Sequence, residues 1–111
     1  MVAPHDRSVD YDRVQIARVA RLCAALGHPL RIRIVALLAS PDTRLSPTQL
    51  ADQLEAPLGN VAYHVRALAK ARLLKQAGRR QVRGAVEHFY TLASDGEHAL
   101  RITDQLAGRA R

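Results

Sequence analysis

Residues 46–70, SPTQLADQLEAPLGNVAYHVRALAK, carry the strongest structural signals in this sequence. The first four are typical of a helix start, with Ser46 as the N-cap, Pro47 at the first helical position and Gln49 at N3 of a capping box. The helix that they open is short, because residues 56–59, APLG, interrupt it within about three turns.

A second helix follows this interruption at once. Its apolar residues Val61, Val65 and Leu68 recur at helical spacing and are expected to face the core. Two short helices joined by so tight a turn predict a helix-turn-helix over residues 46–72. In that motif the second helix enters a DNA groove, so this helix is the candidate for recognition.

Two more helices are expected before this motif. Apolar residues recur at helical spacing over residues 10–26, and Asp10 or Asp12 can cap this helix at its N-terminus. Gly27 ends the helix, and Pro29 then stands where the first turn of a second helix tolerates proline.

A hairpin and a last helix are expected after it. Strand-like runs at residues 73–77 and 86–92 flank residues 78–84, a glycine-bounded loop rich in arginine. This pattern predicts a β-hairpin, or wing, over residues 73–92. The chain then ends in a helix over residues 94–108.

The fold class follows from this order: mainly α with a β-hairpin wing, a winged helix-turn-helix. A chain of 111 residues is expected to form one domain, residues 1–111, since domains typically run about 100–150 residues. Its 48% hydrophobic residues supply a core, and only 4% of all residues are aromatic, which favours helices packed through aliphatic side chains.

Compartment and redox state can also be inferred. No apolar run approaches the roughly 20 residues of a transmembrane helix, and residues 1–13 lack the apolar segment of a signal peptide. We therefore expect a cytoplasmic protein without membrane contact. The single cysteine, Cys23, excludes an internal disulfide and a multi-thiolate zinc site. We expect it to be a small buried hydrophobic residue, with a redox thiol or an inter-subunit disulfide as alternatives.

Positive charge is concentrated in one segment. The chain has 17 Lys and Arg against 10 Asp and Glu, a net charge of +7. Residues 56–86 contain no acid, and a basic patch confined to one part of a small domain favours a surface that binds a polyanion such as double-stranded DNA. A solvated face that only aids solubility is the alternative. The cations of this segment are Arg66, Lys70, Arg72, Lys75, Arg79, Arg80 and Arg83.

Residues 17–92 resemble the ArsR-type winged helix-turn-helix regulators of bacteria. Residues 25–34, ALGHPLRIRI, are similar to the opening of that family's second helix. Residues 60–68, NVAYHVRAL, are similar to its recognition helix, and residues 83–90, RGAVEHFY, to the returning wing strand of a branch common among actinobacteria. The resemblance covers most of the chain and implies the winged helix-turn-helix fold, but it says little about an effector.

The recognition helix has an outward face. At about 100° per residue, the residues that point away from the core side are Gly59, Asn60, Tyr63, Arg66, Ala67 and Lys70. Asn can pair with adenine and Arg with guanine, while Tyr and Lys more often reach phosphates. Leu58, just before the helix, could touch a thymine methyl.

The resemblance adds that DNA contacts come mostly from residues 57–64. His64 lies at the edge of the buried stripe, where a phosphate contact and a half-buried structural role are both open. Arg72 stands where the family usually has glycine, so the chain there must accept a left-handed turn or a different helix end. The expected DNA-binding residues of this region are Pro57, Leu58, Gly59, Asn60, Tyr63, His64, Arg66 and Lys70.

Three wing arginines complete the expected DNA-binding set. Arg79, Arg80 and Arg83 are placed at a hairpin tip where no carboxylate neutralises them. Because a narrow minor groove attracts arginine, we expect them to contact DNA rather than to remain solvated.

Catalysis and metal binding are not indicated. The sequence has none of the motifs G-x-S-x-G, H-E-x-x-H or a glycine-rich phosphate loop, so no enzyme and no cofactor are expected. Asp95, Glu97, His98 and Asp104 of the last helix would make a poor zinc cage, because one histidine falls short of the usual ligand set.

The predicted function is therefore a sequence-specific DNA-binding transcriptional regulator, a dimeric repressor of a palindromic operator. The helices over residues 10–26 and 94–108 would form the dimer interface. The alternatives are a winged-helix module for protein interaction or assembly, and a metal- or redox-responsive sensor with the same fold. The sequence does not identify a small-molecule effector.

Overall fold

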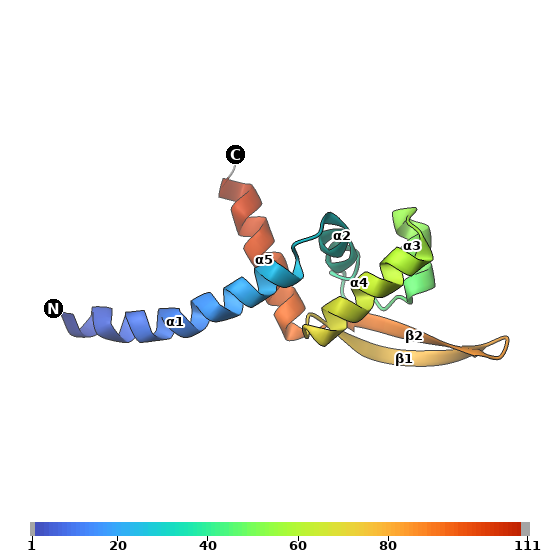
Figure 1. Ribbon diagram of the computed structural model, residues 1–111, viewed down its shortest axis with the longest axis horizontal. Coiled ribbons are helices and arrows are strands. Elements are labelled where there is room, and N and C mark those ends of the chain that lie inside the picture. Colours follow the sequence, from blue (N-terminus) through green and yellow to red (C-terminus); the bar gives the residue numbers. More distant parts are fainter. Residues whose placement is uncertain (1, 110–111) are drawn as a thin grey trace.

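The computed structural model describes residues 2–109, with the side chains of residues 13–102 and 104. Over these residues the chain forms five helices and a two-stranded antiparallel sheet (Figure 1). The predicted fold class, a winged helix-turn-helix, is confirmed. The elements are α1 (Val2–Ala25), α2 (Pro29–Leu37), α3 (Pro47–Leu54), α4 (Leu58–Lys70), β1 (Leu74–Val82), β2 (Ala85–Leu92) and α5 (Ser94–Arg109).

The core lies where α2, α3 and α4 pack on the base of the hairpin. Ile34 of α2 and Leu50 of α3 are fully buried there. The three residues that periodicity placed inside α4, Val61, Val65 and Leu68, are fully buried as well, so that prediction is confirmed. No helix within the described residues is long and apolar enough to cross a membrane.

Local signals place α3 and α4 as predicted. The Ser46 hydroxyl accepts a hydrogen bond from the Gln49 amide at 3.2 Å, and the Gln49 side chain accepts one from the Ser46 amide at 3.0 Å. This reciprocal pair is the expected capping box. Glu55, with φ of 52°, turns the chain between the two helices. Arg72, with φ of 70°, takes the left-handed turn that the family fills with glycine.

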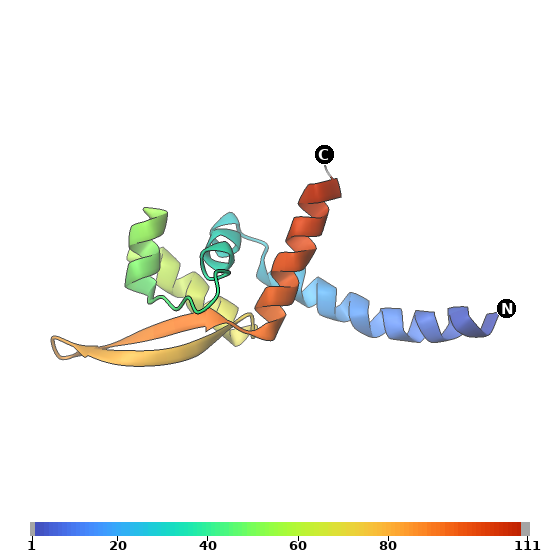
Figure 2. The ribbon, with the colours of Figure 1, turned by 180° about the vertical axis from the view of Figure 1, so that it is seen from behind.

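The first helix is longer than predicted. It begins at Val2, so the expected start at Asp10 or Asp12 is wrong. The only residue before Asp10 that could stop a helix is Pro4, and proline is tolerated in the first turn. Helix α1 extends away from the rest of the molecule, and α5 lies beside its C-terminal half (Figures 1 and 2).

Over its described side chains before Leu22, α1 is therefore largely uncovered within a single chain. Val14 is 71% exposed and Ile16 65% exposed, whereas Leu22, nearer the core, is 1% exposed. Cys23 is also exposed, so its predicted burial is wrong for one copy of the chain. Within one chain α1 packs against the body through Leu22 and Ala25, whereas Ile16 and Cys23, two of the apolar residues that recur at helical spacing, are exposed.

The hairpin also differs from its prediction. The expected loop at residues 78–84 is mostly strand: β1 continues to Val82, and only Arg83 and Gly84 form the turn, with φ of 48° and 82°. Positive φ at both positions matches a two-residue type I′ turn. The pairing register shifts between Gln76 and Gly78, which has φ of 141° and marks a bulge.

Helix α5 approaches the α4–β1 junction closely. A Cβ atom built on Gly96 would lie 2.2 Å from the Leu73 carbonyl oxygen, so only glycine fits there. The Leu73 carbonyl also accepts a hydrogen bond from the Ala93 amide at 2.9 Å. The last helix was expected to form part of the dimer interface, but the side chains of residues 103 and 105–109 lie outside the described residues.

Candidate nucleic-acid interface

The outer side of α4 is accessible along its length. Leu58 at its start is 49% exposed and Tyr63 is 58% exposed. The exposure of Tyr63 agrees with the outward orientation predicted from helical spacing, whereas Leu58, expected just before the helix, is its first residue. We call the exposed residues at the start and on the outer side of α4 the recognition face: Pro57, Leu58, Gly59, Asn60, Tyr63, Arg66 and Lys70.

Gly59 leaves open space on this face. A Cβ built there would meet no heavy atom within 4 Å. The fold therefore does not require glycine at this position, unlike at Gly96. The missing side chain instead lets another backbone come close to the start of α4.

His64 does not belong to the recognition face. Only 9% of it is exposed, and its Nδ1 accepts a hydrogen bond from the Arg31 Nε at 2.9 Å. Its ring centroid lies 4.4 Å from that of His28, whose own Nδ1 caps α2 by accepting from the Leu30 amide at 3.1 Å. Of the two roles left open by the sequence, the structure shows the structural one.

The surroundings of His64 keep it neutral. Burial, followed by the neighbouring His28 and Arg31, lowers its pKa below the ordinary 6.5. A neutral imidazole has the lone pair that the Arg31 hydrogen bond needs. This bond and the ring contact between His28 and His64 join the start of α2 to α4. Sequence reasoning gave His28 no role, although a histidine before Pro29 at a helix start was visible.

One of the three wing arginines is neutralised. The antiparallel register sets Arg80 opposite Glu87, and its NH2 group donates to Oε1 of that carboxylate at 2.9 Å. The expectation that no carboxylate neutralises the wing arginines is therefore wrong for Arg80. Arg79 and Arg83 form no hydrogen bond or ion pair with any side chain that the structure describes.

Glu87 joins the wing to the helix-turn-helix. Its Oε2 accepts a hydrogen bond from the Ser46 hydroxyl at 2.5 Å, and Ser46 is fully buried. The hydrogen bond from Ser46 and then that from Arg80 lower the pKa of this carboxyl, so it is ionised at neutral pH. The sequence predicted Ser46 as an N-cap, but the contact with Glu87, far along the chain, gave no local signal.

A short β-bridge holds the base of the wing. Leu45 and Tyr90 exchange backbone hydrogen bonds of 3.1 and 2.9 Å, and the Thr91 hydroxyl donates to the Thr43 carbonyl at 2.9 Å. The segment before α3 thus pairs with β2 on the side away from β1. It fixes the half of the wing nearest the core.

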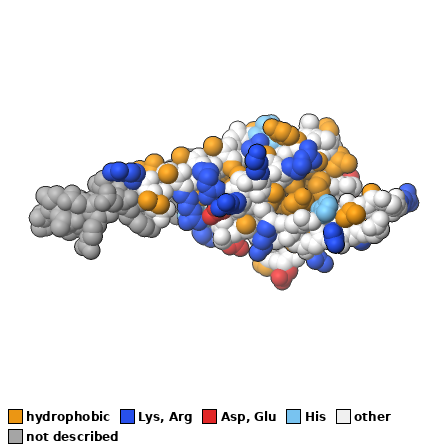
Figure 3. Space-filling model, turned by 60° about the horizontal axis from the view of Figure 1, so that its bottom comes forward, with side chains coloured by type: hydrophobic (Ala, Val, Ile, Leu, Met, Phe, Trp, Pro, Cys, Tyr) orange, Lys and Arg blue, Asp and Glu red, His pale blue; other side chains and the backbone are white. Residues whose placement is uncertain are grey.

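A groove separates the recognition helix from the wing. Its volume is about 500 Å³. Figure 3 shows a hydrophobic hollow on this side of the molecule, with Lys and Arg side chains around it. Arg66 stands on its α4 wall and Thr48 on its α3 wall. The remaining lining residues are Pro47, Ala62, Val65, Val82, Ala85, Val86, Glu87, His88 and Tyr90.

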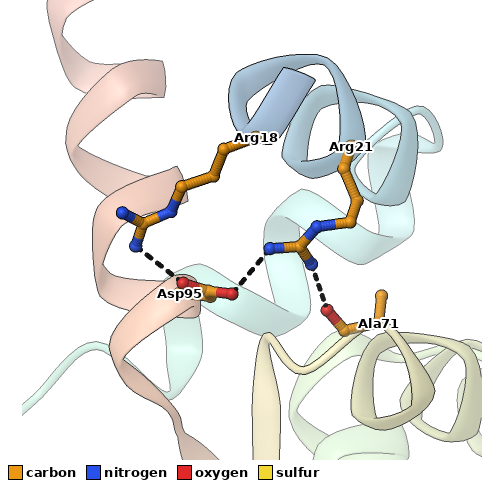
Figure 4. Close-up of polar contacts among 4 residues, drawn as sticks. All are labelled: Arg18, Arg21, Ala71 and Asp95. Carbon is orange, nitrogen blue, oxygen red and sulfur yellow. Dashed lines mark hydrogen bonds and ion pairs between the residues drawn. The ribbon is translucent and has the colours of Figure 1, made fainter. Parts of the chain in front are cut away.

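The far end of α4 is tied to α1 and α5. Asp95 accepts hydrogen bonds from Arg18 at 2.7 Å and from Arg21 at 2.8 Å, and Arg21 also donates to the Ala71 carbonyl at 2.8 Å (Figure 4). These two arginines, Arg21 first, lower the pKa of Asp95. Ala71 is the C-cap of α4, where a cation also stabilises the helix dipole.

Acidic and imidazole side chains are not grouped for metal binding. Within the described residues, no cluster of three or more His, Cys, Asp or Glu could hold an ion. Asp95, one of the candidate ligands, is engaged by two arginines.

Comparison with protein families identifies the central motif. Residues 26–77 match the family model described as a helix-turn-helix domain. Comparison with curated protein sequences finds no match.

Several solved structures share the fold. Reduced HlyU from Vibrio cholerae has a TM-score of 0.68 at 21% identity, over 86% of this chain and 95% of its own. The Mycobacterium bovis protein Mb0332, a possible ArsR-family regulator solved as a homodimeric winged helix-turn-helix DNA-binding domain, has a TM-score of 0.66 at 21% identity, over 89% and 86%. The transcriptional repressor BigR from Xylella fastidiosa has a TM-score of 0.64 at 19% identity, over 95% and 97%.

These matches are to a helix-turn-helix domain and to structures that include a possible ArsR-family regulator and a transcriptional repressor. The predicted resemblance to ArsR-type proteins is confirmed at the level of the fold.

Proposed function

Because this chain has the winged helix-turn-helix fold of ArsR-type regulators, we propose that it is a sequence-specific DNA-binding transcriptional regulator. More specifically, it is a dimeric repressor that binds a palindromic operator in the cytoplasm. One observation carries the proposal: the exposed recognition face and the arginine-bearing wing border the same groove, and residues 56–86, which form α4 and most of the wing, contain no acid.

The two parts of this surface have different tasks. Tyr63 and Arg66 of α4 read bases in the major groove, supported by Asn60 and Lys70. Arg79 and Arg83 hold phosphates or enter the minor groove, since neither has a partner among the described side chains. Gly59 admits the DNA backbone close to the start of α4.

A second copy of the chain covers α1. The exposed apolar stripe around Ile16 lines a shallow hollow with Val19 and Ala20. One recognition helix gives too little contact for tight specific binding, whereas a two-fold dimer presents two, about 34–36 Å apart. The related Mycobacterium bovis domain is described as homodimeric, which supports this arrangement.

The test begins with operator selection from random duplexes, starting with DNA upstream of the protein's own gene. Arg66→Ala should weaken binding to the selected duplex by about 1–3 kcal/mol and binding to a scrambled duplex much less. Arg101→Ala removes the same charge from α5 and serves as the matched control.

The wing is tested by the pair Arg79→Ala and Arg83→Ala together. This variant should weaken both duplexes and flatten the log–log salt dependence by roughly one unit for each phosphate that the wing no longer neutralises. Equal losses for Arg66→Ala on both duplexes would contradict the assignment of base reading to α4. If the wild type selects no duplex, the interaction-module alternative is favoured instead.

A further inference from the structure

We propose that Glu87 determines the specificity of the DNA interface: its carboxylate fixes the wing against α3 and withholds Arg80 from the phosphates of random DNA. This inference rests on the proposed DNA-binding function. It assigns a role to the one acid on a surface whose other charged residues are Lys and Arg.

Glu87 is exceptional by position. It is the only acidic residue between residues 56 and 94. A carboxylate beside a phosphate backbone repels it, so an acid in this segment weakens DNA binding unless something offsets its charge. Arg80, directly opposite on β1, supplies that offset at 2.9 Å.

The carboxylate is held from the helix-turn-helix side. Its second oxygen accepts the hydrogen bond of Ser46, which is fully buried and caps α3. Because the Ser46 hydroxyl is fixed by the capping box, the position of Glu87 relative to α3 is fixed too. The wing therefore presents itself at one angle to the recognition helix before any DNA is bound.

Arg80 remains within reach of a ligand. Its side chain is 62% exposed, and its guanidinium carbon lies 5.5 Å above the centre of the Phe89 ring. An exposed Arg–carboxylate pair is weak, so a phosphate placed correctly beside it can share or take over the guanidinium. A randomly placed phosphate meets a neutral pair instead.

The two kinds of DNA binding respond differently to this arrangement. Binding to random DNA depends on the number of cations that release counterions, and the Glu87–Arg80 pair removes one from that number. Binding to the operator keeps its base contacts and gains from the fixed angle of the wing. Since specificity is a difference between two affinities, an acid that weakens random binding more than operator binding improves it.

The test compares Glu87→Gln with Glu97→Gln. Gln keeps an oxygen that can accept from Ser46 but removes the charge. Glu97→Gln makes the same change of charge at an exposed residue of α5. Each variant is titrated with the selected operator and with a scrambled duplex at several salt concentrations, by fluorescence anisotropy.

Glu87→Gln should bind the scrambled duplex roughly five- to tenfold more tightly and steepen its log–log salt slope by about one unit. Operator affinity should change less, so the ratio of the two affinities falls. Arg80→Ala added to Glu87→Gln should abolish the gain, because the freed guanidinium causes it. Glu97→Gln should leave the ratio unchanged.

Three results would overturn the inference. One is an equal gain for Glu87→Gln and Glu97→Gln, which would show an effect of net charge alone. Another is a loss on both duplexes with a lower unfolding temperature, the mark of a purely structural residue. The last is a gain that persists without Arg80. Failure of the wild type to prefer any duplex would instead refute the proposed function, and this inference with it.

Discussion

At the scale of single residues, Gly59 and Gly96 show that the same amino acid can serve opposite needs. Gly96 is forced by a backbone 2.2 Å from where a Cβ would lie, whereas Gly59 has nothing within 4 Å. Both stand in the first turn of a helix, and glycine in a helix costs up to about 0.5–1 kcal/mol relative to alanine. Glycine at position 59 is not needed for packing, so we expect its benefit to lie in DNA binding.

Gly59→Ala should therefore raise the free energy of unfolding by about 0.5–1 kcal/mol and still weaken operator binding. Urea unfolding and duplex titration measure the two effects on one variant. Gly96→Ala is the contrasting control, because it should lower stability through the clash with Leu73. If Gly59→Ala binds the operator as tightly as the wild type, the DNA backbone does not approach Gly59 closely.

His64 gives the molecule a dependence on pH. Its folded-state pKa lies below the ordinary 6.5, so below about pH 6.5 the unfolded chain takes up a proton that the folded chain refuses. The free energy of unfolding should fall as the pH drops through this range, and level off for this residue once the pH is below the folded-state pKa. His64→Gln should flatten the decline in urea unfolding between about pH 7.5 and pH 5. An identical decline in the variant would show that other groups cause it.

At the scale of the elements, the joint between α1, α4 and α5 depends on Asp95. Asp95→Asn should lower the free energy of unfolding by about 1 kcal/mol, because two partly exposed arginines lose their acceptor charge. The lowered pKa of Asp95 means that the folded state favours its charged form. Its contribution is therefore complete above the ordinary pKa of 3.8 and disappears as the pH falls through the folded-state value.

Thermal unfolding of the wild type and Asp95→Asn at neutral and acidic pH checks this prediction. The difference between the two proteins should shrink in acid. Glu97→Gln, two residues further along α5, should unfold like the wild type at neutral pH. A difference that stays constant down to strongly acidic pH would mean that the loss is steric.

The elements that sequence alone could place are those with local causes. The capping box of Ser46 and Gln49 fixed the start of α3, and the periodicity of Val61, Val65 and Leu68 fixed the buried side of α4. All of these signals lie within a few residues of the structure that they specify.

The features that sequence missed depend on contacts between distant residues. Arg80 and Glu87 meet because the bulge near Gly78 and the two-residue turn set the register of the two strands. Neither the bulge nor the turn could be predicted without knowing how the strands pair. His64 was ambiguous for the same reason: its burial comes from Arg31 and His28 of the α2 region.

At the scale of the whole molecule, a single copy leaves apolar residues of α1 exposed. The uncovered stripe of α1 predicts that Ile16→Asp shifts the protein from dimer to monomer at micromolar concentration, because a buried charge at an apolar interface is costly. Light scattering on the purified protein measures the mass. Ile32→Asp changes an exposed apolar residue of α2 and should leave the dimer intact. A wild type that is monomeric with and without DNA would refute the dimer.

The attachment of the hairpin has a mechanical consequence. The wing is a cantilever, clamped at its root by the Leu45–Tyr90 bridge and propped partway along by Glu87 on Ser46, with the Arg83–Gly84 turn at its free end. The deflection of a beam grows steeply with distance from its last support. Thermal motion should therefore move Arg83 through a wider arc than Arg80. In the proposed DNA complex, a stiff α4 and a compliant wing end would then allow the protein to follow grooves of different width.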